Sequence, residues 1–83
     1  MTKVEMYTTR ICSYCVMAKR LLSSIDQEYT EIGVDFDHGK RAWLVETTGQ
    51  RTVPQIFIDG QPIGGYQELA ALHRSGELAR LLS

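Results

Sequence analysis

The chain has 83 residues, 43 % of them hydrophobic, and its nine Lys and Arg against ten Asp and Glu give a formal net charge of −1. This length predicts one small domain over residues 1–83. The near-zero charge argues against electrostatic binding to nucleic acid or to a membrane surface, and no apolar stretch approaches the ~18 residues of a membrane span. No apolar signal segment precedes the first patterned residues, so we expect a cytoplasmic protein, in which paired cysteines indicate redox or metal chemistry.

The first half of the chain predicts a strand, a helix, a second strand and a second helix, over residues 4–7, 13–25, 29–33 and 41–47. Val4 and Met6 alternate with charged residues, as in a half-buried strand. From Ala18 onward, apolar residues recur at i, i+3, i+4 and i+7, which is one face of an amphipathic helix. Gly49 follows the second helix and is expected to end it.

The second half is divided by glycine and proline into a hairpin and further helical segments, which we expect over residues 55–58, 61–64, 66–74 and 78–82. Asp59-Gly60 predicts a two-residue turn because both of its positions need a positive φ. Pro62 lacks a backbone donor, so its strand is expected at the edge of the sheet. A glycine pair at 64–65 ends the hairpin and precedes the next helix.

The element order β-α-β-α-β-β-α, followed by a short helical piece, predicts an α/β fold. The first two strands require a parallel pair joined by a right-handed crossover, and the hairpin adds an antiparallel pair. The result is a four-stranded mixed sheet with helices on both faces. This arrangement is the thioredoxin-like fold in its smallest form.

Cys12 and Cys15 flank Ser13 and Tyr14 at the start of the first predicted helix. At a helix N-terminus several backbone N–H groups have no partner within the helix, and the helix dipole presents about half a positive charge. A thiolate at Cys12 accepts those donors, so we expect its pKa to lie well below the free value of about 8.5. Cys15 is one turn further on and is expected to stay a thiol. This asymmetry makes Cys12 the predicted nucleophile and Cys15 the predicted resolving thiol.

Two structural roles for the cysteine pair fit the sequence less well. A disulfide between residues so close in the chain closes too small a loop to stabilise the fold much. A structural zinc site needs four ligands, and the only other candidates, His38 and His73, lack the spacing of zinc-finger histidines. Redox chemistry is therefore the favoured interpretation, and we predict no metal site from the spacing.

Three motifs together resemble those of the glutaredoxins of the short, dithiol, bacterial type, namely C-S-Y-C at 12–15, T-V-P-Q at 52–55 and G-G-Y-Q-E at 64–68. Their order and separations agree along essentially the whole chain. The resemblance implies a glutathione-dependent thiol–disulfide oxidoreductase that uses glutathione as co-substrate. It also implies disulfide-containing or glutathionylated proteins as partners, with glutathione reductase involved only indirectly, through glutathione. We expect the protein to be a monomer.

The resemblance further implies a glutathione site next to Cys12, with the candidate residues Arg10, Tyr14, Arg51, Thr52, Val53, Pro54, Gly65, Tyr66, Gln67 and Glu68. In this fold the proline of T-V-P is cis, which turns the N–H and C=O of Val53 toward the cysteinyl backbone of the ligand. A plain turn before a strand is the alternative role for this motif. The free N–H groups of Tyr66 and Gln67 at a helix N-terminus suit the γ-glutamyl carboxylate, and Tyr14 is expected to form a wall of the groove.

Two positions in the expected site depart from the family pattern. Glu68 stands where family members usually carry Asp to meet the ammonium group of the ligand, and it is equally suited to be a first-turn acid favoured by the helix dipole. Thr9 stands where the family often has Lys for the glycine carboxylate. Arg10 or Arg51 is the expected substitute, with Gln50 as a neutral donor, and an arginine that only meets solvent is the alternative for each.

A third departure, Ser13, leaves an alternative function open. Most dithiol glutaredoxins have proline after the first cysteine, and the loss of this proline accompanies binding of a [2Fe–2S] cluster in some members. There the cluster lies between two subunits and is ligated by the first cysteine of each, here Cys12, and by two glutathiones. The resemblance therefore leaves an iron–sulfur carrier or sensor as the alternative, while a serine that only tunes the thiol pKa is the simpler explanation.

Overall fold

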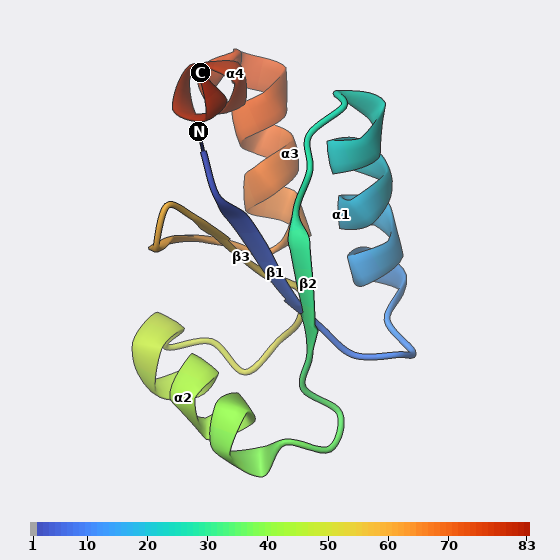
Figure 1. Cartoon of the computed structure of the whole chain (residues 1–83), viewed down its shortest axis with the longest axis vertical. Helices are drawn as coiled ribbons and strands as arrows, with labels where there is room; N and C mark the ends of the chain where they lie inside the picture. The colour runs from blue at the N-terminus through green and yellow to red at the C-terminus, as the bar shows by residue number, and fades with distance from the viewer. Residues whose placement is uncertain (1) are drawn as a thin grey trace.

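The computed structural model describes residues 2–83, in which eight elements follow one another along the chain. They are β1 (Val4–Thr8), α1 (Ser13–Ser24), β2 (Thr30–Gly33), α2 (His38–Thr48), β3 (Gln55–Ile58), β4 (Gln61–Gly64), α3 (Tyr66–Ser75) and α4 (Glu77–Leu82). The strands form one sheet in the order β2-β1-β3-β4, in which β1 and β2 are parallel and the other neighbouring pairs are antiparallel (Figure 1). The predicted thioredoxin-like α/β fold is confirmed. No helix within residues 2–83 is long and apolar enough to cross a membrane.

The alternating residues of β1 place it between two helical layers at the centre of the sheet. Val4, Met6 and Thr8 are buried, and Val4 and Met6 belong to the core beneath α1 and α3. Tyr7 points to the opposite face, as the two-residue period of a strand requires, and packs toward α2. β4 lies at the edge of the sheet, where Pro62 needs no N–H partner on its outer side.

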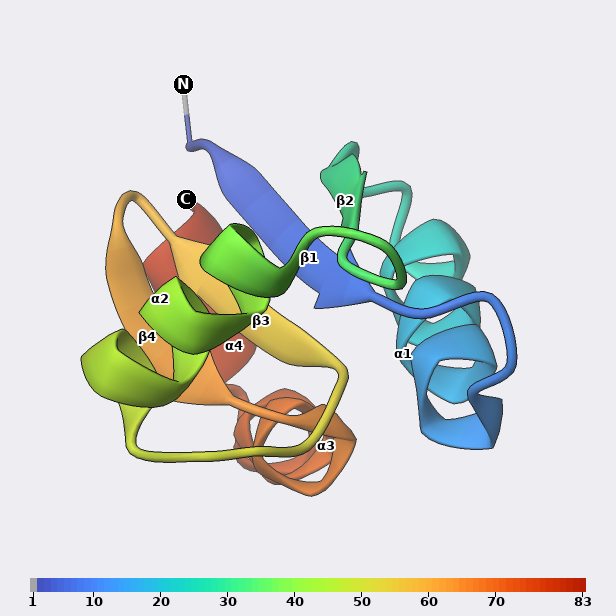
Figure 2. The same cartoon turned by 90° about the horizontal axis from the view of Figure 1, so that it is seen from below.

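Apolar side chains fill both sides of the sheet. The larger core, packed by α1, α3 and α4, comprises Val4, Met6, Ala18, Leu22, Ile56, Ile58, Leu69 and Leu78. The smaller core, packed by α2, comprises Val34, Leu44 and Phe57. α2 accordingly lies apart from α1 and α3 (Figure 2). Removal of this apolar surface from water is the main force that holds the helices on the sheet.

The predicted elements are present with ends within one residue of those expected, except that α2 begins at His38 rather than at Arg41. The earlier start has a local cause, because the Asp37 carboxylate accepts a hydrogen bond from the backbone N–H of Lys40 at 2.9 Å and caps the helix. The apolar pattern that predicts this helix begins only after that capped turn. At the other end, Gly49 ends α2 in the left-handed conformation with φ 72°, as expected.

The turn between β3 and β4 also agrees with its sequence signal. Asp59 and Gly60 both have positive φ, 50° and 82°, which is the geometry that closes a two-residue hairpin. The Asp59 carboxylate accepts a hydrogen bond from the backbone N–H of Lys3 at 2.8 Å. This contact joins the hairpin to the start of β1.

Replacing Leu69 with Ala should destabilise the protein by about 2–5 kcal/mol, the usual loss for a leucine in a filled core. Leu69 is fully buried between α3 and the sheet. The matched control is Leu81→Ala, because Leu81 on α4 keeps 40 % of its surface exposed, and its loss should be on the order of 0.5 kcal/mol. Urea unfolding of the reduced variants measures both values, and equal losses would contradict the packing described for α3.

Candidate active site

The two cysteines lie at the end of the sheet where the strand β1 finishes and the helix α1 begins. Residues 9–12 connect these elements. β2 runs parallel to β1, while β3 runs antiparallel to β1 and β4 antiparallel to β3. The last residues of β2 and β4 and the first residues of β3 therefore lie at the same end of the sheet as the last residues of β1. The segments 34–37, 52–54 and 64–66 accordingly flank the cysteines.

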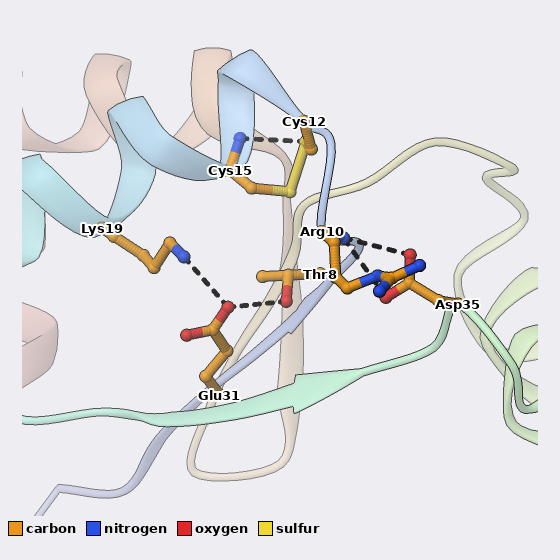
Figure 3. Close-up of polar contacts among 7 residues, drawn as sticks. All are labelled: Thr8, Arg10, Cys12, Cys15, Lys19, Glu31 and Asp35. Atoms are coloured by element: carbon orange, nitrogen blue, oxygen red, sulfur yellow. Dashed lines mark hydrogen bonds and ion pairs between the residues drawn. A yellow bond between two sulfur atoms is a disulfide. The ribbon is translucent and has the colours of Figure 1, made fainter.

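Cys12 is the N-cap of α1, and its sulfur accepts a hydrogen bond from one of the N–H groups that have no partner within that helix. Its backbone is extended, with φ −157° and ψ 104°, and its sulfur accepts a hydrogen bond from the backbone N–H of Cys15 at 3.0 Å (Figure 3). The first turn of α1 contains no acidic residue that would oppose negative charge. The N–H groups and the dipole of the helix thus stabilise a thiolate at Cys12.

Cys15 differs from Cys12 in its exposure to solvent. Cys12 is half-buried, whereas Cys15 retains only 1 % of its surface. The two residues form a disulfide in this structure, with their Cα atoms 5.2 Å apart. An outside molecule therefore reaches the sulfur of Cys12 first, and Cys15 is close enough to bond with it without movement of the backbone.

The T-V-P segment lies directly beside the cysteines. The Val53–Pro54 peptide bond is cis, as the resemblance implies, and the carbonyl oxygen of Val53 is 3.6 Å from the Cys12 sulfur. A backbone acceptor therefore lies next to the sulfur of Cys12.

A groove of about 210 Å³ extends from this segment to the start of α3. It is lined by Tyr14, Thr52, Val53, Pro54, Gly65, Tyr66, Gln67 and Glu68, so eight of the ten predicted binding residues lie together. The rings of Tyr14 and Tyr66 face each other with centroids 6.1 Å apart and planes 26° apart. Gly65 is the N-cap of α3 and has no side chain to occupy the free N–H groups there. The groove therefore combines aromatic walls with a helix N-terminus that suits an anion.

The two predicted arginines do not line this groove. The backbone N–H of Arg10 donates to the carboxylate of Asp35 at 3.0 and 3.2 Å, and its guanidinium lies 4.8 Å from the centre of the Phe36 ring. Arg51 is exposed, and its carbonyl oxygen accepts a hydrogen bond from Arg41. Gln50 lines a neighbouring hollow that shares Thr52, Gly65 and Glu68 with the groove.

Glu68 has a structural contact that explains its position in the first turn of α3. Its carboxylate accepts a hydrogen bond from the backbone N–H of Gly65 at 2.7 Å and so closes the start of the helix. Gly64, with φ 108°, lies under this side chain, and a Cβ there would come 2.8 Å from Glu68 Cγ. Glu68 thus serves as the first-turn acid and also lines the groove.

A polar network behind the cysteines joins side chains of β1, α1 and β2. Thr8 at the end of β1 is 2 % exposed, and its hydroxyl donates to the Glu31 carboxylate on β2 at 2.8 Å. Lys19 on α1 donates to the same oxygen at 3.0 Å (Figure 3). The Thr8 hydrogen bond, and then that of Lys19, lower the pKa of Glu31 below its ordinary value. The network ties the second turn of the cysteine-bearing helix to the sheet.

The geometry of the site defines a class of protein. A cysteine pair at a helix N-terminus, next to a cis-proline at the end of a mixed sheet, is the site of a thiol–disulfide oxidoreductase with the thioredoxin-like fold. Within residues 2–83 no three His, Cys, Asp or Glu side chains gather as a metal site within one chain would require.

Comparisons with known proteins identify the family. The glutaredoxin family model matches residues 4–63, and the chain belongs to the glutaredoxin family. It is 46 % identical to glutaredoxin 3 of Escherichia coli K12 over 82 residues, 99 % of both chains, and 43 % identical to a glutaredoxin of Pseudomonas aeruginosa over 83 residues, 100 % of this chain and 99 % of the other. The structure of a buckwheat glutaredoxin–glutathione complex superposes with a TM-score of 0.90 at 34 % identity, covering 98 % of this chain and 76 % of that one. Membership of this family supports thiol–disulfide oxidoreductase activity, and the iron–sulfur alternative is not favoured.

The stability contributed by Glu31 should depend on pH. Because its pKa is lower in the folded protein than the ordinary value of 4.5, its contacts stabilise the fold above that value and are lost as the pH falls through the lowered pKa. The wild type should therefore exceed Glu31→Gln in free energy of unfolding at neutral pH, by on the order of 1 kcal/mol, and the difference should vanish in acid.

Urea unfolding at a series of pH values measures this difference. Glu28→Gln is the control, because Glu28 is exposed and its carboxylate makes no hydrogen bond or ion pair within residues 2–83. A difference between the wild type and Glu31→Gln that is the same at every pH would contradict an ionised Glu31 as its source.

Proposed function

We propose that this protein is a glutathione-dependent oxidoreductase that reduces protein disulfides and glutathione mixed disulfides through Cys12. The observation that carries the proposal is the groove beside the Cys12 sulfur, with the Val53 backbone at one end and the N-terminus of α3 at the other. The structurally similar buckwheat glutaredoxin is described as a complex with glutathione. That description supports glutathione as the ligand here.

The cysteinyl and γ-glutamyl parts of glutathione have chemical partners along the groove. The cysteinyl backbone of the ligand pairs with the N–H and C=O of Val53, which brings its sulfur next to Cys12. The γ-glutamyl carboxylate accepts hydrogen bonds from the free backbone N–H groups of Tyr66 and Gln67 at the start of α3. The Glu68 carboxylate supplies negative charge for the ammonium group of the ligand, and Tyr14 and Tyr66 cover its apolar parts.

The reaction begins with attack of the Cys12 thiolate on one sulfur of the substrate disulfide. A new S–S bond forms to Cys12, the substrate S–S bond breaks, and the departing thiolate takes up a proton. When Cys12 carries glutathione, a second glutathione thiolate attacks the glutathionyl sulfur, releases oxidised glutathione and restores the Cys12 thiolate. One incoming glutathione thus completes the reduction of a glutathione mixed disulfide, and a separate glutathione reductase regenerates reduced glutathione from the oxidised product.

A protein mixed disulfide follows a second route through Cys15. The Cys15 thiol loses its proton and attacks the Cys12 sulfur, the bond to the substrate protein breaks, and the departing thiolate takes up a proton. Two glutathiones then reduce the resulting Cys12–Cys15 disulfide, by way of a Cys12–glutathione disulfide, and leave as oxidised glutathione. The proximity of the two cysteines and the burial of Cys15 support this role. The reaction requires a compartment that keeps glutathione reduced, in agreement with the cytoplasmic location expected from the sequence, and a monomer suffices for it.

Cys15→Ser should keep the reduction of glutathione mixed disulfides and lose most of the reduction of protein disulfides, because only the latter needs a resolving thiol. Turnover of a small glutathione mixed disulfide, coupled to glutathione reductase and NADPH, measures the first activity, and reduction of a protein disulfide measures the second. Cys12→Ser is the control and should abolish both. Equal loss of both activities in Cys15→Ser would contradict the two routes, and a wild type without turnover of the small substrate would contradict the proposed function.

A further inference from the structure

The strand order puts the reactive cysteine between two different surfaces. Cys12 follows β1, which is the second strand of the order β2-β1-β3-β4. The groove proposed for glutathione lies over the start of β3 and the end of β4. On the other side of Cys12 is the loop 34–37, which follows β2 at the same end of the sheet. A protein that brings a disulfide to Cys12 while glutathione occupies the groove must therefore lie over this loop and the residues just before Cys12.

This second surface carries two large apolar side chains that make little contact with the rest of the protein. Ile11, immediately before Cys12, is 98 % exposed, and Phe36 is 80 % exposed. They are the most exposed large hydrophobic residues within residues 2–83. Neither contributes to a core cluster, so the fold does not explain their apolar character. Exposed aromatic and aliphatic side chains next to a reactive centre are typical of a contact surface for a partner.

The two loops that carry these side chains are held together, and one positive charge lies between them. The Asp35 carboxylate accepts the backbone N–H of Arg10 (Figure 3), and the Arg10 guanidinium rests over the Phe36 ring at 4.8 Å. Arg10 takes part in none of the ion pairs found within residues 2–83. The Asp35 carboxylate is held by a backbone N–H and keeps its negative charge, so this surface carries one charge of each sign, with the Arg10 guanidinium beside the Phe36 ring.

From these observations we propose that Ile11, Phe36 and Arg10 form the docking surface for the protein part of the substrate. The surface selects disulfides or glutathionylated cysteines whose flanking residues include an apolar side chain and a carboxylate. The apolar side chain packs on Ile11 and Phe36, and the carboxylate pairs with the Arg10 guanidinium. This inference rests on the proposed function and adds to it a preference among protein substrates, which the groove alone does not provide.

Three glutathionylated cysteine peptides test the proposal, with Leu and Glu, Ser and Glu, or Leu and Lys beside the cysteine. kcat/KM is measured for each with the coupled glutathione reductase assay, alongside a small glutathione mixed disulfide that has no peptide. The wild type should prefer the Leu–Glu peptide over each of the other two by roughly fivefold or more. Phe36→Ser and Ile11→Ser should remove the preference for Leu over Ser while turnover of the small substrate stays within about twofold.

The charge is tested separately with Arg10→Glu, which should reverse the preference between the Leu–Glu and Leu–Lys peptides. Leu81→Ser is the matched control, because it removes an exposed leucine from α4 and should leave every peptide ratio unchanged. Equal kcat/KM for the three peptides in the wild type, or unchanged ratios in the Phe36 and Ile11 variants, would overturn the docking surface while the small-substrate activity still supports the proposed function. A wild type without activity on the small substrate would overturn the proposed function and this inference with it.

Discussion

The hydrogen bond from the backbone N–H of Cys15 to the sulfur of Cys12 is the contact on which the proposed chemistry of this protein depends. It exists because Cys12 is the N-cap of α1, where N–H groups lack partners within the helix. The same helix buries Cys15 and leaves Cys12 half-exposed. One local feature, the start of a helix at a cysteine, thus both favours negative charge on the sulfur of Cys12 and separates the proposed roles of the two sulfurs.

The rest of the fold holds the start of α1 at the end of the sheet where several other segments meet. The parallel pairing of β1 and β2 and the antiparallel pairing of β1 and β3 bring a loop, a cis-proline segment and a second helix N-terminus to the same end. The Thr8–Glu31–Lys19 network fixes α1 to both parallel strands behind the cysteines. A small domain can therefore place a redox pair between a ligand groove and an open surface with only a few residues from each element.

Local signals in the sequence predict most of this arrangement, and contacts between distant residues account for what they miss. The N-cap at Cys12 and the turn at Asp59-Gly60 depend on the backbone conformation of neighbouring residues only, so the sequence of these residues predicts their geometry. The apolar pattern predicts a start of α2 at Arg41, three residues too late, because the capping residue Asp37 lies outside that pattern. Asp is a residue type that favours the N-cap position, so the residue itself is a local signal for the true start. The position of Arg10 depends on Asp35, which is far along the chain, and no spacing rule reveals that contact.

The most direct test of the central claim is a pH titration of single-cysteine variants, followed by the ultraviolet absorbance of the thiolate. Cys15→Ser leaves only Cys12, which should ionise with a pKa well below the free value of about 8.5, because the N-terminus of α1 favours its charged form. Cys12→Ser leaves only Cys15, which is buried and should ionise near or above that value. A Cys12 pKa equal to that of Cys15 would contradict the helix N-terminus as the source of reactivity.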